Sequence, residues 1–254
     1  MLSMLSYLTQ GGNVALFALL VLVLRLPIVC LSLSIHESAH GWAALRMGDP
    51  TAKMCGRISL NPFKHFDLIG TISMIVLGIG WAKPVPINTR YFKNQKKGMA
   101  LSAAAGPISN LLLALISILL LRAFDIIIFG GIYYSAISGS YSLADIAPSL
   151  MLESSLALAD KLKVVLMFFL EMSAILNISL AIFNLIPVPP FDGSRIAFAV
   201  LPDNIYFGIM KYERIIMLVF IFLFYQFGSG FSYLVNGVFD RVYSLISLAT
   251  SFLA

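Results

Sequence analysis

The chain has 254 residues, of which 59% are apolar and 11% are charged. Soluble domains carry about 25% charged residues, so 17 Lys and Arg with 12 Asp and Glu are too few to cover a water-soluble globule of this size. Intrinsic disorder is excluded as well, because disordered segments are poor in apolar residues. The composition predicts a multi-pass membrane protein, and an all-α one, since the apolar runs far exceed the roughly 10-residue alternating strands of a transmembrane barrel.

Basic residues outnumber acidic ones and give a net charge of +5. In a membrane protein such an excess usually lies in cytoplasmic loops. We therefore interpret it as a topology signal of a chain embedded in a lipid bilayer, and we expect no nucleic-acid partner.

The first long apolar run, residues 14–35, exceeds the roughly 20 residues that span a hydrocarbon core. Its helical character continues to about Met47, and the following Gly48-Asp49-Pro50 favours a helix stop. We expect no cleavable signal peptide, because this run lacks a basic region before it.

The next stretch, residues 51–61, is rich in β-compatible residues and predicts a short membrane-associated β-hairpin. Residues 66–81 are apolar but short, and basic segments flank them on both sides. If both flanks are cytoplasmic, this segment cannot cross the membrane once, so we expect a re-entrant segment. Residues 82–97 follow, where Pro84 and Pro86 favour extended backbone.

Later apolar runs predict further spans. Residues 99–121 and 161–186 are the clearest, and the acidic stretch 124–160 between them is expected outside the cell. Residues 215–227 predict a fourth span, and residues 231–254 predict either a last span or an interfacial helix.

Two of the three histidines lie in His36-Glu37-Ser38-Ala39-His40, the pattern H-E-x-x-H on a helix. Residues four apart share one helix face, so both imidazoles can hold one Zn²⁺ while Glu37 takes a proton from the metal-bound water. Independent placement gives this pattern roughly 0.0006 times in a chain of this composition. Ionisable groups in membrane spans cost about 2.5–3.5 kcal/mol each on insertion scales, which favours function over helix packing.

A catalytic zinc usually has three protein ligands and a water, so one more ligand is needed. Asp192 follows the proline-rich end of the 161–186 span, where a broken helix can bring its carboxylate sideways; an Asp-Gly turn paired with Arg195 is the alternative. His65 is a rival ligand and Cys55 a weaker one. We favour Asp192.

Five motifs run from residue 36 to residue 193: HESAH from His36, NPFKHFDLIGT from Asn61, GWAKPVPIN from Gly80, AGPISN from Ala105 and NLIPVPPFDG from Asn184. Together they resemble the site-2 protease family of intramembrane zinc metalloproteases, in its compact bacterial form without a PDZ domain. One departure is Asn184-Leu185, where that family often has Asn-Pro. The resemblance implies a single polytopic domain over residues 1–254, with a three-helix catalytic core at about 14–193 and C-terminal helices at about 206–254.

The resemblance also implies one zinc ion per chain, held by His36, His40 and Asp192, with Glu37 as general base. It suggests further that Asn110 contacts the substrate or steadies the oxyanion. From the residues alone, an interhelical hydrogen bond in a small-residue interface is an equal alternative for Asn110.

The expected reaction is hydrolysis of a peptide bond within or near a transmembrane segment of a membrane-protein substrate, as in regulated intramembrane proteolysis. An extended edge at residues 85–89 is a candidate for pairing with an unwound substrate. The alternatives are a metal-ion transporter or channel with the same ligands, and an inactive membrane-binding relative. Glu37 beside a closed ligand set argues against transport, and the complete motif set argues against inactivity. The resemblance indicates a bacterial inner-membrane location.

Overall fold

The structure is a computed structural model in which three long helices dominate: α2 (Gly12–Arg46), α5 (Gln95–Phe129) and α8 (Leu158–Asn184). Three further helices follow, α9 (Asp192–Ala197), α11 (Glu213–Phe227) and α12 (Ser229–Ala249), and α3 (Thr51–Met54) is a single turn. Short 3₁₀ turns lie at Pro62–Lys64, Thr89–Tyr91, Phe198–Val200 and Ser251–Leu253. The residues described are 12–70, 72, 82–131, 157–202, 205, 208–209, 211–227 and 229–253.

Three of the described helices are long and apolar enough to cross a membrane, at Ala18–Arg46, Gln95–Ile128 and Leu158–Asn184. They coincide with the three clearest predicted spans in length and composition, and their crossing of the membrane stays a prediction. The predicted fourth span is helical as α11, but its 15 residues reach only about 22 Å at 1.5 Å per residue, short of a hydrocarbon core of about 30 Å. Its crossing of the membrane, like that of the tail helix α12, stays a prediction.

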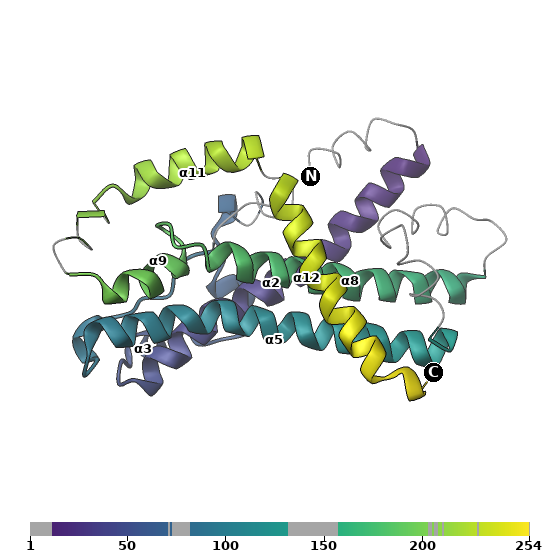
Figure 1. The fold of residues 1–254 in the computed structure, drawn as a ribbon, viewed down its shortest axis with the longest axis horizontal. Helices are drawn as coiled ribbons and strands as arrows, with labels where there is room; N and C mark the ends of the chain where they lie inside the picture. Colours follow the sequence, from purple (N-terminus) through teal and green to yellow (C-terminus); the bar gives the residue numbers. More distant parts are fainter. Residues whose placement is uncertain are drawn as a thin grey trace.

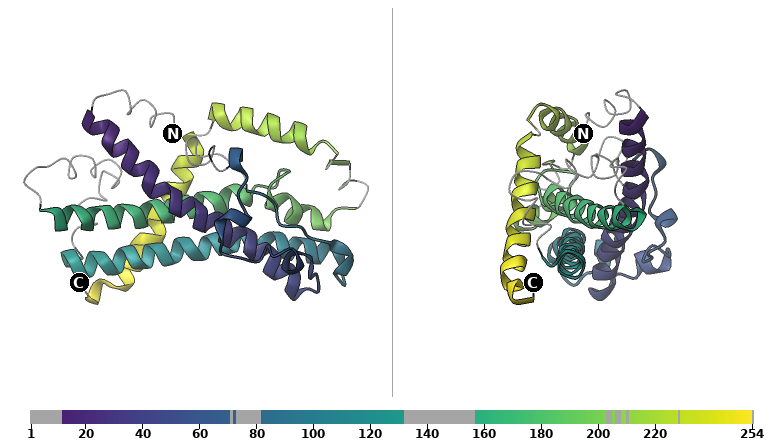
Figure 2. Two further views of the ribbon diagram at one scale, coloured as in Figure 1. Left: turned by 180° about the vertical axis from the view of Figure 1, so that it is seen from behind. Right: turned by 90° about the vertical axis from the view of Figure 1, so that its right-hand side faces the viewer.

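The helices form three layers around the pair α5 and α8, which run side by side (Figure 1). The end-on view in Figure 2 shows α2 on one face of this pair and α12 on the opposite face. Helix α11 lies beside the layers in Figure 1, and its Phe220 ring contacts Phe183 of α8 and Phe191, with centroids 5.7 and 5.0 Å apart. The α5–α8 pair is therefore the central element, and α2 and α12 pack against it.

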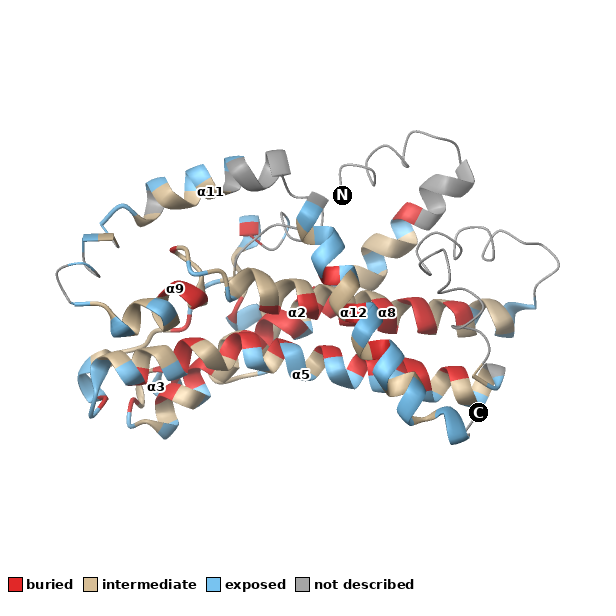
Figure 3. Ribbon diagram, in the orientation of Figure 1, coloured by how far each residue is buried: buried red, intermediate tan, exposed pale blue. Residues whose placement is uncertain are grey.

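Aliphatic and aromatic side chains fill the space between α5, α8 and α12, and Figure 3 shows the resulting buried stripe along α5 and α8. On the other face, Val29 and Leu33 of α2 pack against Leu176 and Leu180 of α8. The outward side of α5 carries exposed apolar residues, among them Leu112 and Ile116. Such residues suit contact with lipid, because hydrocarbon tails are as apolar as leucine.

The ends of these helices follow from local chemistry. Asn94 caps α5 by accepting a hydrogen bond from the Lys97 N–H, and Gly130 ends it in the left-handed region at φ 64°. After α2, the fully buried Asp49 carboxylate accepts from the N–H groups of Thr51 and Asn88, at 2.9 and 2.7 Å. The predicted helix stop thus also anchors the later segment at residue 88.

The predicted β-hairpin at residues 51–61 is wrong. This stretch forms the single helical turn α3 followed by turns, with Gly56 in the left-handed region at φ 62°. The Asp49 side chain accepts the first N–H of α3, and such capping outweighs the weak β propensity of a short stretch. The predicted re-entrant segment falls largely on residues 71 and 73–81, outside the described residues, and the external segment falls largely on the equally undescribed 132–156.

A buried ion pair within α5 is hydrogen-bonded to α12 and the residue that follows it. Arg122 Nη1 lies 2.9 Å from Asp125 Oδ2, and both side chains are at least 95% buried. Arg122 Nε also donates to Thr250 Oγ1 at 3.0 Å, and Tyr243 Oη donates to Asp125 Oδ2 at 3.2 Å. Since an isolated charge is costly in an apolar interior, these partners make α12 part of the packed structure.

We predict that Asp125→Leu destabilises the protein by about 3–5 kcal/mol, because it leaves the buried Arg122 charge without a counter-ion. Tyr243→Phe removes one hydrogen bond and should cost only about 1 kcal/mol. Unfolding in detergent, followed by loss of helical circular dichroism, measures both. Equal stability of the Asp125→Leu variant and the parent would contradict the role given to this ion pair.

Candidate metal centre

His36 and His40 project from one face of α2, one turn apart, as their spacing predicts. Their rings meet edge to face with centroids 4.6 Å apart, and their Nε2 atoms lie 3.0 Å from each other. Both residues are more than 90% buried. The H-E-x-x-H pattern therefore places two imidazole nitrogens together inside the helix bundle.

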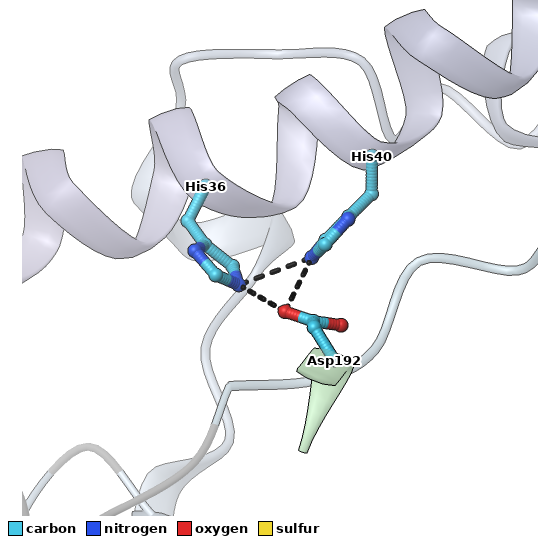
Figure 4. Close-up of side chains that lie close together, drawn as sticks. All are labelled: His36, His40 and Asp192. Atoms are coloured by element: carbon cyan, nitrogen blue, oxygen red, sulfur yellow. Dashed lines mark hydrogen bonds and ion pairs between the residues drawn. The ribbon is translucent and has the colours of Figure 1, made fainter. Parts of the chain in front are cut away.

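Asp192, the first residue of α9, completes the group, as Figure 4 shows. Its Oδ2 lies 3.2 Å from Nε2 of each histidine. A chain with three prolines between α8 and α9 brings it there, and Gly193 allows the close turn, since a Cβ at that position would collide with the Leu185 carbonyl. The structure thus unites the three predicted ligands, although Asp192 lies 152 residues after His40 in the sequence.

The outer nitrogens of both rings are already engaged. His40 Nδ1 donates to the Ser102 carbonyl at 2.7 Å, and His36 Nδ1 donates to Asn110 Oδ1 at 2.5 Å. A neutral imidazole carries one N–H, so each ring directs the lone pair of Nε2 toward Asp192. Hydrogen bonds of this kind orient metal-binding histidines in proteins.

The donor atoms fit a zinc ion. Two nitrogen lone pairs and a carboxylate oxygen converge at 3.0–3.2 Å, and only a proton or a metal cation can hold such acceptors together. Ligands at about 2.0–2.1 Å from a tetrahedral Zn²⁺ lie about 3.3 Å apart. The observed triangle therefore has the dimensions of one face of a zinc tetrahedron, with the fourth corner left for water or substrate.

Burial raises the pKa of the Asp192 carboxyl, but protonated imidazoles at His36 and His40 outweigh burial through hydrogen bonds and charge and hold that pKa well below its usual range. A metal cation in the same place would act in the same direction, because an opposite charge favours the carboxylate.

Glu37 lies outside the ligand group, as a general base requires. Its Oε2 accepts the backbone N–H of Val85 at 3.0 Å. Beside it, Ser38 Oγ donates to the Ser59 carbonyl at 2.8 Å and accepts the Ser59 N–H at 3.0 Å. Glu37 and Ser38 thus attach α2 to the loops that follow it.

The rival ligands lie elsewhere. His65 is buried with its Nε2 donating to the Ser59 carbonyl at 2.8 Å, and Cys55 is exposed. Arg195 contacts Met99 Sδ at 3.7 Å, so no ion pair between Arg195 and Asp192 is seen among the described contacts. Of the candidates for the third ligand, the structure brings only Asp192 to the two histidines.

Three residues around the site escaped sequence reasoning: Ser102, Gly106 and Asn177. A Cβ on Gly106 would collide with both imidazoles, so this glycine lets α5 approach the histidines. Asn177 is 99% buried and accepts from Asn110 Nδ2 at 2.8 Å. The sequence offered one indication of its importance, namely that Asn177 is a polar residue in an apolar helix.

A helical membrane protein with a buried His-His-Asp group belongs to the class of membrane metalloenzymes by its fold and site. The model of peptidase family M50 matches residues 25–227, and the chain belongs to that family. "Putative zinc metalloprotease YwhC" of Bacillus subtilis is 35% identical over 193 residues, which cover 76% of each chain. "Putative zinc metalloprotease Rip2" of Mycolicibacterium smegmatis is 33% identical over 100 residues, covering 37% of this chain and 38% of that protein.

No solved structure matches the chain. Family and relatives nonetheless agree with the resemblance drawn from the five motifs, and the chain is an intramembrane zinc metalloprotease. The matched residues run from α2 to α11 and stop before α12.

We predict that Gly106→Ala weakens zinc binding about 10- to 100-fold, because the added methyl group would displace both imidazoles. Gly237→Ala is the matched control, since a Cβ at this α12 position meets nothing within 4 Å. Competition with a zinc chelator measures both affinities. Zinc binding by Gly106→Ala at the parent's affinity would show that the close approach of α5 is not needed.

Proposed function

We propose that this protein hydrolyses a peptide bond within or near a transmembrane segment of a membrane-protein substrate, with zinc held by His36, His40 and Asp192. The observation that carries the proposal is the triangle of three donor atoms at 3.0–3.2 Å, built on membrane-length helices. We further propose that residues 1–254 form one polytopic domain in a bacterial inner membrane, with the catalytic core at about 14–193.

Bound zinc would supply Lewis-acid chemistry, polarising the scissile carbonyl and lowering the pKa of a water molecule. Glu37 would accept the water's proton and pass it to the leaving amine. The Val85 N–H holds Oε2 of Glu37, and this bond fixes one oxygen of the carboxylate. A fixed base avoids reorganisation during proton transfer, which is how preorganised groups contribute to catalysis.

A helical substrate must unwind before its carbonyls become accessible, because they are bonded within the helix. The segment 83–88 forms neither helix nor strand, and pairing with an unwound strand remains a proposal for it. Lys83, Val85 and Asn88 already donate their N–H groups to His65, Glu37 and Asp49. Pro84 and Pro86 have none, and Arg57 Nη2 donates to the Lys83 and Pro84 carbonyls, so a substrate strand would depend mainly on the carbonyl groups after Pro84.

The alternative of a metal transporter or channel requires a path with successive sites. Among the described residues, only one group of His, Cys, Asp and Glu could hold a metal ion. An inactive relative would keep the fold without the chemistry, yet Glu37 and the complete ligand set are present here. These observations support the protease over both alternatives.

The decisive experiment compares the parent with Glu37→Gln in detergent, using a transmembrane model substrate. We expect about one zinc per chain in both proteins, because Glu37 is not a ligand, and loss of cleavage in the variant, because an amide cannot accept the proton. Zinc content and cleavage products are measured on the same samples. A zinc-loaded parent that cleaves no such substrate would favour transport or an inactive relative.

A second test concerns the bond between Val85 and Glu37. Val85→Pro removes the N–H that holds the carboxylate, so we expect kcat to fall about tenfold at unchanged zinc content. Val85→Ala is the matched control, because it shortens the side chain and keeps the N–H. If both variants lost activity equally, packing of residue 85 rather than its hydrogen bond would be responsible.

A further inference from the structure

The two histidines hold their ring protons in different ways. His40 Nδ1 faces the backbone carbonyl of Ser102, which can only accept, so this nitrogen must carry the proton. His36 Nδ1 faces the side chain of Asn110 instead. An amide can present either its oxygen or its NH₂ group, so another contact must decide which atom of Asn110 faces the ring.

Asn177 of α8 determines which atom of Asn110 faces His36. It lies 2.9 Å from the Ser173 carbonyl, and since a carbonyl only accepts, Nδ2 of Asn177 must face it. Oδ1 of Asn177 is then left to accept from Asn110 Nδ2 at 2.8 Å. With its Nδ2 used, Asn110 presents Oδ1 to His36, whose Nδ1 must donate.

We propose that Asn177 is a positioning residue which, through Asn110, sets the tautomer of His36 and keeps its Nε2 lone pair available for zinc. This rests on the proposed function of His36 as a ligand. Asn110 and Asn177 are 100% and 99% buried. If one of the two amides is removed, solvent therefore cannot replace the hydrogen bond that the other loses. The chain of hydrogen bonds runs in one direction, from α2 across α5 to the backbone of α8.

The first test is Asn177→Leu, which has a similar volume and no hydrogen-bonding group. Asn110 then loses its acceptor and can turn its NH₂ group toward His36, which favours the Nε2–H tautomer that has no lone pair for zinc. We expect zinc affinity to fall about tenfold, at the lower end of losses for groups behind metal ligands. Nitrogen NMR of the zinc-free protein should show His36 shifting from Nδ1–H to Nε2–H. Parent-like affinity would overturn the proposal.

The second test is a rescue by Asn110→Asp. An ionised carboxylate only accepts, so it holds the His36 proton on Nδ1 without guidance from Asn177. In this background Asn177→Leu should change zinc affinity by less than about twofold, and the double-mutant cycle isolates the coupling. Equal losses in both backgrounds would show that residue 177 acts through packing alone and would overturn the proposal.

Ser117→Ala is the matched control. It breaks a hydrogen bond between the Ser117 and Ser173 hydroxyls, 2.9 Å long and joining the same two helices, and leaves the chain of amides intact. We expect Ser117→Ala to bind zinc with the parent's affinity. A tenfold loss in this variant would show that Asn177→Leu acts through helix packing and would overturn the proposal. The zinc titration needs no cleavage, so failure of this inference is distinct from failure of the proposed protease function.

Discussion

The mutual repulsion of three lone-pair donor atoms is the constraint on which this structure depends. Nε2 of His36, Nε2 of His40 and Oδ2 of Asp192 approach within 3.0–3.2 Å in a buried position. In an apolar environment such a group is unfavourable unless a cation offsets it. The rest of the core holds these atoms in place until a cation binds, and the binding free energy of zinc then contributes to the stability of the fold.

Close backbone approach at two glycines allows the helices to hold these three atoms together. Gly106 brings α5 against both imidazoles, and Gly193 brings the start of α9 against the end of α8. A Cβ at residue 106 would collide with both imidazoles, and a Cβ at residue 193 would collide with the Leu185 carbonyl. The glycines in the AGPISN and NLIPVPPFDG motifs are therefore explained by packing around the metal centre rather than by turn conformation alone.

Sequence reasoning succeeded where the pattern was local. His36 and His40 share a helix face whatever the tertiary structure, and the helix stop at Asp49 follows from its neighbours. Asp192 is remote, and only the need for a third ligand and the resemblance to a family selected it. The β-hairpin at 51–61 failed because a side-chain cap decided a stretch whose own propensity is weak. Asn177 could not be assigned, since a lone asparagine in an apolar helix does not reveal its partner.

The central α5–α8 pair separates two functions onto opposite faces. One face carries α2 and the metal ligands, and the other carries α12 and the buried Arg122–Asp125 pair (Figures 1 and 2). Along α5, Asn110 and Asp125 are 15 residues apart, or about 22 Å at 1.5 Å per residue. Sites this far apart with no shared partner contribute additively to stability. Helix α12, beyond the family match at residue 227, can therefore stabilise the bundle without entering the chemistry of the metal centre.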